Sequence, residues 1–277
     1  MVLQGIAKGL YHRKLTIISL IILGVIMLSG ALAPVLAPND PTLISLENKF
    51  LSPSIQFPFG TDHLGRCILS RLMYGAITSL GSALVVMSVT ITISIIMGTL
   101  SGYMGGRVDA FLMRLCDMIL AFPNLVLTLV IVGMLGPSLI NVIIAMVVVQ
   151  WVWYARIIRG MVLSLKERSF VLSAKVTGTP DWLIIVRHIL PNIIPHIVVL
   201  ATLNLGMVIL HISGLSFLGL GVQPPTPEWG AMLNDAKQFL RSDPRLIMFP
   251  GTMILLVVIS FNLLGDALRD AIEFRES

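Results

Sequence analysis

The side chains best suited to binding a metal or a small solute lie in a mostly apolar stretch at 192–220. His211 lies within this stretch, and Met207 precedes it by one helical turn. Residues four apart share one face of a helix, so both side chains can point into one cavity. Imidazole suits nickel, copper and zinc, and a thioether is a softer ligand. We predict that Met207 and His211 line a cavity and that His211 is a candidate metal ligand. The alternative is that His211 hydrogen-bonds a neighbouring helix and Met207 only fills the core.

The rest of the sequence lacks the patterns that carry catalysis. It contains no Gly-Lys dipeptide, hence no P-loop for nucleotide phosphates, and no GxSxG or HExxH pattern. Cys67 and Cys116 have no CxxC partner, so neither a disulfide framework nor a cysteine metal cluster is predicted. Asp62, His63 and Arg66 offer ligand chemistry, but Asp62 and Arg66 are four apart and are predicted to pair on a helix. No catalytic residue and no cofactor bound by this chain are therefore predicted.

The composition indicates that membrane helices position these residues. Of the 277 residues, 56% are hydrophobic and 12% are charged, whereas a soluble domain carries about 25% charged residues. Several runs long enough to cross a bilayer contain no Asp, Glu, Lys or Arg. Gly136-Pro137 divides the long apolar region at 118–155 into two helices, because proline cannot continue a helix. We predict an all-α membrane protein with six transmembrane helices, at 15–36, 78–103, 111–135, 138–154, 192–220 and 246–268.

The distribution of basic residues predicts the orientation of these helices. With the N-terminus in the cytoplasm, the inner segments hold thirteen of the 19 Lys and Arg residues. Cytoplasmic loops carry such an excess, so we predict a multi-pass protein of the cytoplasmic (inner) membrane with both termini cytoplasmic. The first helix ends like a signal peptide at Ala31-Leu32-Ala33, but its apolar run is long and Pro34 follows, which favours an uncleaved anchor. The inner loops account for most of the positive charge, and no nucleic-acid partner is expected.

The cytoplasmic segment 167–195 has the pattern of two short helices around a turn. The first helix is predicted at 169–177 and ends at Gly178, a residue type that commonly terminates helices. Thr179 can cap the second helix, and Pro180 suits its first turn. Ser173 and Ala174 are small, so the backbone of a partner could approach closely. We predict that another protein docks here, and the alternative is an ordinary amphipathic linker.

This segment resembles the EAA loop of ABC importer permeases, whose pattern is Glu-Ala-Ala, three residues, Gly, nine residues and Ile-x-Leu-Pro. Four positions keep both residue and spacing: Ala174, Gly178, Leu190 and Pro191. Three positions depart from the pattern: Leu172, Ser173 and His188. The resemblance implies a coupling helix seated in a groove of an ATPase subunit. Leu172 cannot make the contact of the motif's glutamate, but the remaining positions still predict the docking surface.

Three further stretches resemble the dipeptide, oligopeptide and nickel permease group, and they occur in the expected order. They are Gly60-Thr61-Asp62 with Gly65-Arg66, the 216–221 stretch with Glu228-Trp229-Gly230, and 265–270. Peptide-type members of the group often carry Glu at the position of Ile212. In this chain that position is apolar, and His211 precedes it. The stretches 150–156 and 210–214 look closer to nickel-type permeases.

The resemblance implies a type I ABC importer permease fold without an ATPase site of its own. The implied partners are a second permease subunit, two ATPase subunits that use ATP and Mg²⁺, an extracytoplasmic substrate-binding protein and the lipid bilayer. The chain would form half of the translocation pathway for nickel or a metal chelate, with Met207 and His211 facing it. The alternatives are a di- or oligopeptide importer and, from a different class, a secondary transporter, which would need carboxylates near mid-membrane.

The sequence divides into four predicted segments. They are 1–37 (cytoplasmic N-terminus and first helix), 38–71 (extracytoplasmic), 72–268 (five-helix permease core) and 269–277 (cytoplasmic tail). In the outer segment 227–241, Trp229, Met232 and Leu233 share one face, which predicts a short interfacial helix on the membrane surface, capped by Thr226. Near the inner end of the third helix, Arg114 and Asp117 are predicted to neutralise each other.

Overall fold

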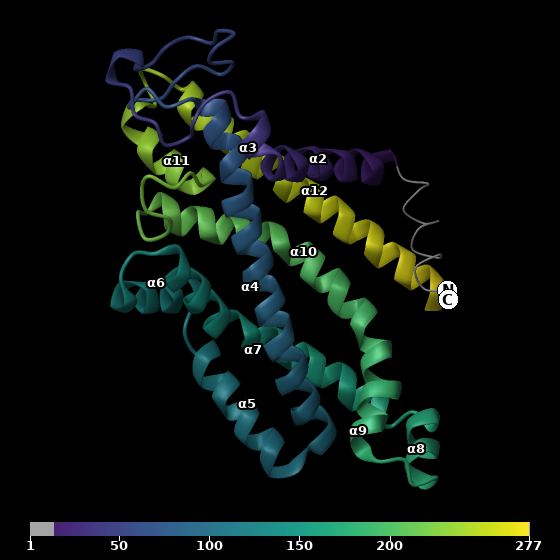
Figure 1. Ribbon diagram of the computed structural model, residues 1–277. Helices are drawn as coiled ribbons and strands as arrows, with labels where there is room; N and C mark the ends of the chain where they lie inside the picture. The colour runs from purple at the N-terminus through teal and green to yellow at the C-terminus, as the bar shows by residue number, and fades with distance from the viewer. Residues whose placement is uncertain (1–13, 277) are drawn as a thin grey trace.

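The computed structural model describes residues 14–276, and every regular element in this range is helical (Figure 1). Residues 1–13 of the predicted N-terminal segment and Ser277 lie outside it. The elements are α2 (Lys14–Ala31), α3 (Ala33–Leu36), η1 (Leu46–Asn48), α4 (Ile68–Met104), α5 (Gly106–Leu120), α6 (Asn124–Leu135), α7 (Leu139–Lys166), α8 (Ser169–Val176), α9 (Asp181–Ile184), η2 (Ile185–Ile189), α10 (Leu190–Phe217), α11 (Trp229–Ala236), η3 (Lys237–Phe239) and α12 (Arg245–Glu276). The all-α prediction is confirmed.

The number of membrane spans agrees with the sequence. Helices α2, α4, α7 and α12 and the continuous unit from α9 to α10 are each long and apolar enough to cross a membrane. Helices α5 and α6 pass the same test together, which gives six spans when this bent pair is counted as one.

The third predicted span, 111–135, is wrong as a single straight helix. Helix α5 ends at Leu120, α6 begins at Asn124, and the two helices are bent by 84°. Pro123 lies at the break, where its missing N–H and its ring prevent a continuous helix. The prediction used the break at Gly136-Pro137 and overlooked Pro123.

Three helices extend beyond their predicted bounds into charged sequence. Helix α4 begins at Ile68, α7 continues to Lys166, and α12 continues to Glu276 through the segment predicted as a tail. In α4 and α7 these arginines are paired with aspartates: Arg71 with Asp62 and Asp235, Arg156 with Asp117, and Arg159 with Asp109.

Asp117 therefore pairs with Arg156, and the predicted Arg114 pair is not the one formed. Helix bounds predicted from runs without charged residues are therefore too short where an aspartate pairs with an arginine of the helix.

The most extensive helix contact joins α4 to α7, and two glycines allow their backbones to approach closely. A Cβ on Gly98 would lie 2.6 Å from the carbonyl oxygen of Ala155, and one on Gly102 would lie 2.9 Å from that of Arg159. Only glycine fits such a backbone approach, and small residues four apart are a common membrane-helix interface. The two helices consequently form one tightly packed pair.

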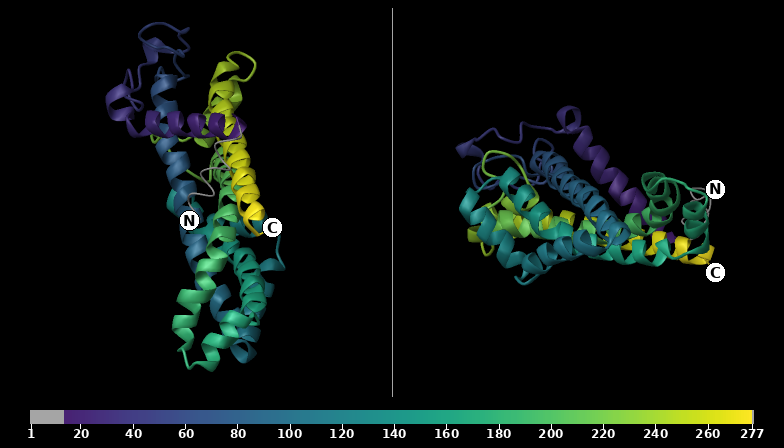
Figure 2. Two further views of the ribbon diagram at one scale, coloured as in Figure 1. Left: turned by 90° about the vertical axis from the view of Figure 1, so that its right-hand side faces the viewer. Right: turned by 90° about the horizontal axis from the view of Figure 1, so that it is seen from below.

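The bundle has two distinct ends. Helix α10 packs against α12 and α4, and α2 packs against α12 and α4, around the main apolar core. Helix α11 lies at one end of this bundle, and the α8–α9 hairpin lies at the other (Figures 1 and 2). We refer to these as the α11 end and the α8 end.

Candidate functional site

A recess of about 200 Å³ opens on one side of the bundle between α6, α7 and α10. Both residues predicted to share a cavity, Met207 and His211, line it from α10. Met207 is 49% exposed and His211 is half-buried. The residues that line the recess are Asn124, Leu125, Thr128, Met146, Gln150, Trp153, Tyr154, Asn204, Met207, Val208, His211 and Leu215. The structure therefore joins the α10 pair to Gln150, Trp153 and Tyr154 on α7, which lie in the stretch 150–156 that resembles nickel-type permeases.

The polar groups of the recess are mostly left without protein partners. Among the described residues, none hydrogen-bonds the His211 ring, the Gln150 amide or the Tyr154 hydroxyl. Asn204 differs, because its amide nitrogen donates to the carbonyl of Leu200 at 2.8 Å on its own helix. The alternative prediction for His211, a hydrogen bond to a neighbouring helix, is thus not what this part of the chain forms.

A resident metal site is not formed around His211. Within residues 14–276, no group of three or more His, Cys, Asp or Glu side chains could hold a metal ion. Imidazole alone supplies a single ligand, whereas protein metal sites usually provide three or four.

The α8 end carries the predicted docking loop. Helix α8 ends at Val176, and Gly178 follows with φ of +79°, the conformation that glycine adopts most readily. The N–H of Thr179 donates to Ala174 and that of Gly178 donates to Lys175, which together make a Schellman motif. The predicted first helix and its end at Gly178 are confirmed.

The second helix of this loop begins differently from the prediction. Thr179 makes no capping bond, Pro180 occupies the position before the helix, and α9 starts at Asp181. A π-helical segment, η2, then joins α9 to α10. Leu190 and Pro191 therefore form the first turn of α10, directly after the π-helical segment.

The loop is anchored from within and apolar outside. Val171 is buried against a small apolar core, and the Tyr103 hydroxyl donates to Asp181 Oδ1 at 2.6 Å. Facing outward, Val176 is 87% and Trp182 is 65% exposed. Of the coupling positions, Leu172, Ser173, Gly178 and Pro191 are exposed, whereas Ala174 and Leu190 are half-buried.

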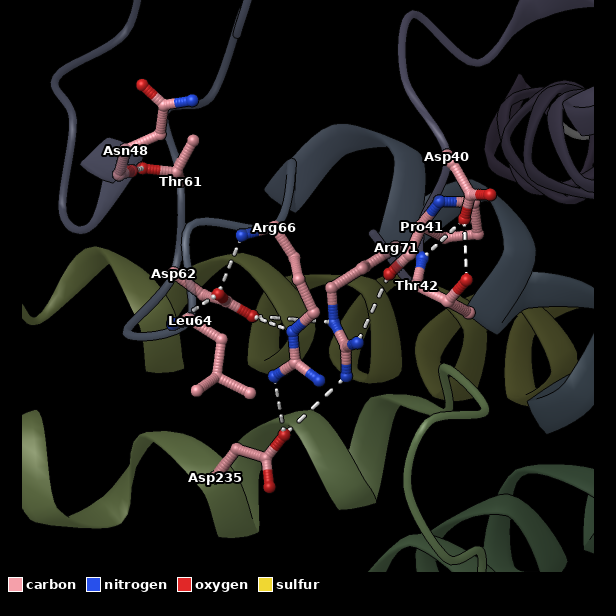
Figure 3. A network of polar contacts seen from close by, with 10 residues as sticks. All are labelled: Asp40, Pro41, Thr42, Asn48, Thr61, Asp62, Leu64, Arg66, Arg71 and Asp235. Carbon is pink, nitrogen blue, oxygen red and sulfur yellow. Dashed lines mark hydrogen bonds and ion pairs between the residues drawn. The ribbon is translucent and has the colours of Figure 1, made fainter. Parts of the chain in front are cut away.

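The α11 end holds a buried network of four charged side chains (Figure 3). Arg66 Nε lies 2.7 Å from Asp62 Oδ2, and Arg66 Nη2 lies 3.1 Å from Asp235 Oδ2. Arg71 reaches the same two carboxylates at 3.7 and 3.5 Å. The predicted Asp62–Arg66 pair is confirmed, but it lies in a turn rather than on a helix, and Asp62 also accepts the N–H groups of Leu64 and Arg66.

Helix α11 is wrongly predicted as an interfacial helix, because it is packed inside the bundle. Trp229 is 0% exposed, and its indole nitrogen donates to the carbonyl of Leu72. Glu228, rather than Thr226, is the N-cap, and its carboxylate accepts from the N–H groups of Gly230 and Ala231. The hydroxyl of Ser79 also donates to Glu228, so the capping residue ties α11 to α4.

Comparisons with known proteins agree on one family. Residues 90–277 match the family described as "Binding-protein-dependent transport system inner membrane component", and residues 3–53 match the "N-terminal TM domain of oligopeptide transport permease C". The nickel transport system permease protein NikC of Escherichia coli is 43% identical over 92% of both chains. The dipeptide transport system permease protein DppC of Alkalihalophilus pseudofirmus is 41% identical over 96% of this chain and 88% of its own.

Other matches extend the same group. The glutathione transport system permease protein GsiD of Escherichia coli is 42% identical over 95% of this chain and 86% of its own. A chain from a solved structure of the MetNI methionine ABC transporter in inward-facing conformations superposes with a TM-score of 0.55. It covers 72% of this chain and 97% of its own at 14% identity, which supports the type I importer permease fold.

Proposed function

Because this chain belongs to the binding-protein-dependent transport system inner membrane components, in the nickel and peptide group of ABC importer permeases, we propose that it forms half of a pathway for nickel carried as a metal chelate. The recess on α6, α7 and α10 is its half of that pathway, with Met207 and His211 facing the solute. The observation that carries this is that one bundle has both a recess lined by polar and apolar side chains and, at one end, an exposed loop with the pattern of a docking site.

The partner set follows from the family and from what the chain lacks. A second permease subunit completes the pathway, and two ATPase subunits supply energy from ATP and Mg²⁺. An extracytoplasmic binding protein delivers the solute. Both termini and the α8 end lie in the cytoplasm, which the excess of Lys and Arg in the inner segments supports.

The α8 loop is the contact with the ATPase subunits. Exposed apolar side chains such as Val176 and Trp182 would be costly in water and are covered when the loop enters a groove. Leu172, Ser173, Ala174 and Gly178 present the surface of the helix and its turn, and Leu190 and Pro191 pass its movement to α10. Nucleotide binding to the ATPases then biases the bundle between two states.

The docking role is tested by enlarging a side chain on the exposed surface. Ser173→Trp should abolish copurification of the ATPase subunits and solute-dependent ATP hydrolysis, because the indole would fill the contact surface. Ser54→Trp, at an exposed position far from the loop, is the matched control and should leave both unchanged. ATPase subunits that copurify in normal amount with the Ser173 variant would contradict the role.

Nickel is preferred as the solute because His211 lines the recess and because NikC is among the similar permeases. The second candidate is a di- or oligopeptide, which the similarity to dipeptide and glutathione permeases favours. Uptake of labelled nickel and of a labelled dipeptide by cells expressing the whole transporter separates the two. His211→Ala should lower nickel uptake, and equal nickel uptake in variant and wild type would remove His211 from the pathway.

A further inference from the structure

The recess combines polar side chains with a complete lack of formal charge. In the lining formed by the described residues there is no Asp, Glu, Lys or Arg, although amides, a phenol and an imidazole face the space. Resting on the proposed function, we infer that this half of the pathway recognises an electrically neutral metal chelate, and that Tyr154 and Gln150 are its hydrogen-bonding specificity determinants.

Tyr154 is the clearest candidate for a hydrogen bond to a solute in the recess. Its side chain is only 5% exposed, yet no described residue hydrogen-bonds its hydroxyl. The hydroxyl is not among the fully buried polar atoms that lack a partner in the described part of the chain, so it reaches the open space of the recess. The ring is held by the Trp153 ring, which meets it edge-on with centroids 4.8 Å apart. A fixed, unpaired hydroxyl that lines a cavity is suited to a solute that supplies the partner.

Gln150 extends this hydrogen-bonding surface along α7. It precedes Tyr154 by one helical turn, so both side chains lie on one face, opposite His211 on α10. Its amide offers both donors and an acceptor, and the Tyr154 hydroxyl offers one donor and an acceptor. Carboxylate oxygens that already ligate a metal still have lone pairs, and both side chains can donate to them.

Because the lining of the recess carries no formal charge, it favours a solute whose net charge is zero. An ion at membrane depth is costly unless a countercharge compensates it. Neither a hydrated Ni²⁺ ion nor an anionic chelate finds a countercharge in this lining. A chelate whose ligands cancel the metal charge avoids that cost and keeps polar atoms for Gln150 and Tyr154.

The test uses the complete transporter in proteoliposomes, with its binding protein at saturating concentration. Labelled nickel is supplied as the neutral bis-glycinate, as the anionic citrate complex or as the hydrated ion. We expect the bis-glycinate to enter at least tenfold faster than the other two. Faster entry of the citrate complex or of the hydrated ion would overturn the inference.

Two variants with little change of shape test the named side chains. Tyr154→Phe removes only the hydroxyl and should lower bis-glycinate uptake about fivefold, the effect of one hydrogen bond. ATP hydrolysis stimulated by the loaded binding protein should stay within twofold of wild type, which a folding defect would not permit. Gln150→Glu adds a charge at constant shape and should raise uptake of the hydrated ion relative to the bis-glycinate. Tyr74→Phe, outside the recess, is the matched control.

The outcomes separate this inference from the proposed function. Suppose that the wild-type transporter imports nickel while the Tyr154→Phe and Gln150→Glu variants import every nickel species at the wild-type rate. That result would overturn the inference and leave the proposed function standing. A wild-type transporter that imports the dipeptide but no form of nickel would overturn both the proposed solute and the inference.

Discussion

The α11 end and the α8 end of the bundle differ in how their polar and apolar side chains are placed. At the α11 end, charged and polar groups are turned inward and satisfied by one another: Arg66 and Arg71 meet Asp62 and Asp235, and Glu228 caps α11. At the α8 end, apolar side chains such as Val176 and Trp182 are turned outward. The α11 end is therefore distinguished by its buried polar groups, since exposed apolar side chains such as Leu240 occur there as well as at the α8 end.

This difference leads us to expect different effects of substitutions at the two ends. Buried charges require all their partners, because removing one leaves an uncompensated charge. Exposed apolar groups contribute little to folding but can contribute much to association. We therefore expect substitutions at the α11 end to reduce stability and those at the α8 end to reduce assembly.

The largest loss of stability is expected from breaking the four-charge network. Asp235→Ala leaves Arg66 and Arg71 buried with one carboxylate fewer, which should cost about 3–5 kcal/mol. The free energy of unfolding can be followed in detergent with a thiol-reactive dye, because Cys67 and Cys116 are buried and free in the folded chain. Glu47→Ala, at an exposed carboxylate outside the network, is the control. Equal stability of the two variants would remove the network from the comparison.

A smaller loss is expected from the cap of α11. Glu228→Ala removes the acceptor for two backbone N–H groups and for the Ser79 hydroxyl, at a cost of about 1–3 kcal/mol. Glu228→Gln keeps one acceptor oxygen and should fall between that variant and wild type in the same dye assay. A Gln variant less stable than the Ala variant would show that packing, rather than capping, dominates at this position.

An acid-sensitive contribution is expected where α12 begins. Arg245 holds the pKa of Asp243 below its usual value, so this pair stabilises the folded chain above the ordinary aspartate pKa. The contribution is lost as the pH falls through the lower folded-state value. Because Arg245 is partly exposed, solvent screening limits it to less than about 1 kcal/mol. Arg245→Gln should lower stability at neutral pH and match wild type in strong acid; a difference that persists there would exclude this pair as its source.

The smallest effect on stability is expected at the α8 end. Trp182→Ala should change the free energy of unfolding of the isolated chain by less than about 0.5 kcal/mol, because the indole is mostly exposed. In the assembled transporter the same change should weaken retention of the ATPase subunits on a column. A destabilised isolated chain with normal retention would reverse the contrast between the two ends.

Sequence patterns predicted the helices well where one local rule decided the outcome. Charge-free runs located the spans, and Gly178 marked the end of α8, because only a residue tolerant of positive φ fits there. The bend at Pro123 follows the same kind of rule and was open to prediction. Met207 and His211 were placed on one cavity by helical spacing alone, and both line the recess.

Features that depend on distant residues could not be read in the same way. Arg71 and Asp235 are far apart in sequence, and nothing local indicates that they pair. Glu228 follows the preference for polar residues before a helix, yet its full burial depends on α4 and α10 closing around it. Tyr154 was read as the end of a span, whereas α7 continues twelve residues further and leaves its hydroxyl inside the bundle.

The close contact between α4 and α7 at Gly98 and Gly102 has a mechanical consequence. With Gly98 and Gly102 against the backbone of α7, the two helices cannot slide or tilt independently without opening a gap along their shared length. Helix α7 leads directly into α8, and α4 extends over 37 residues, about 55 Å, to Arg71 near its opposite tip. If the α8 loop moves as proposed, we expect the paired helices α7 and α4 to carry that movement toward the four-charge network.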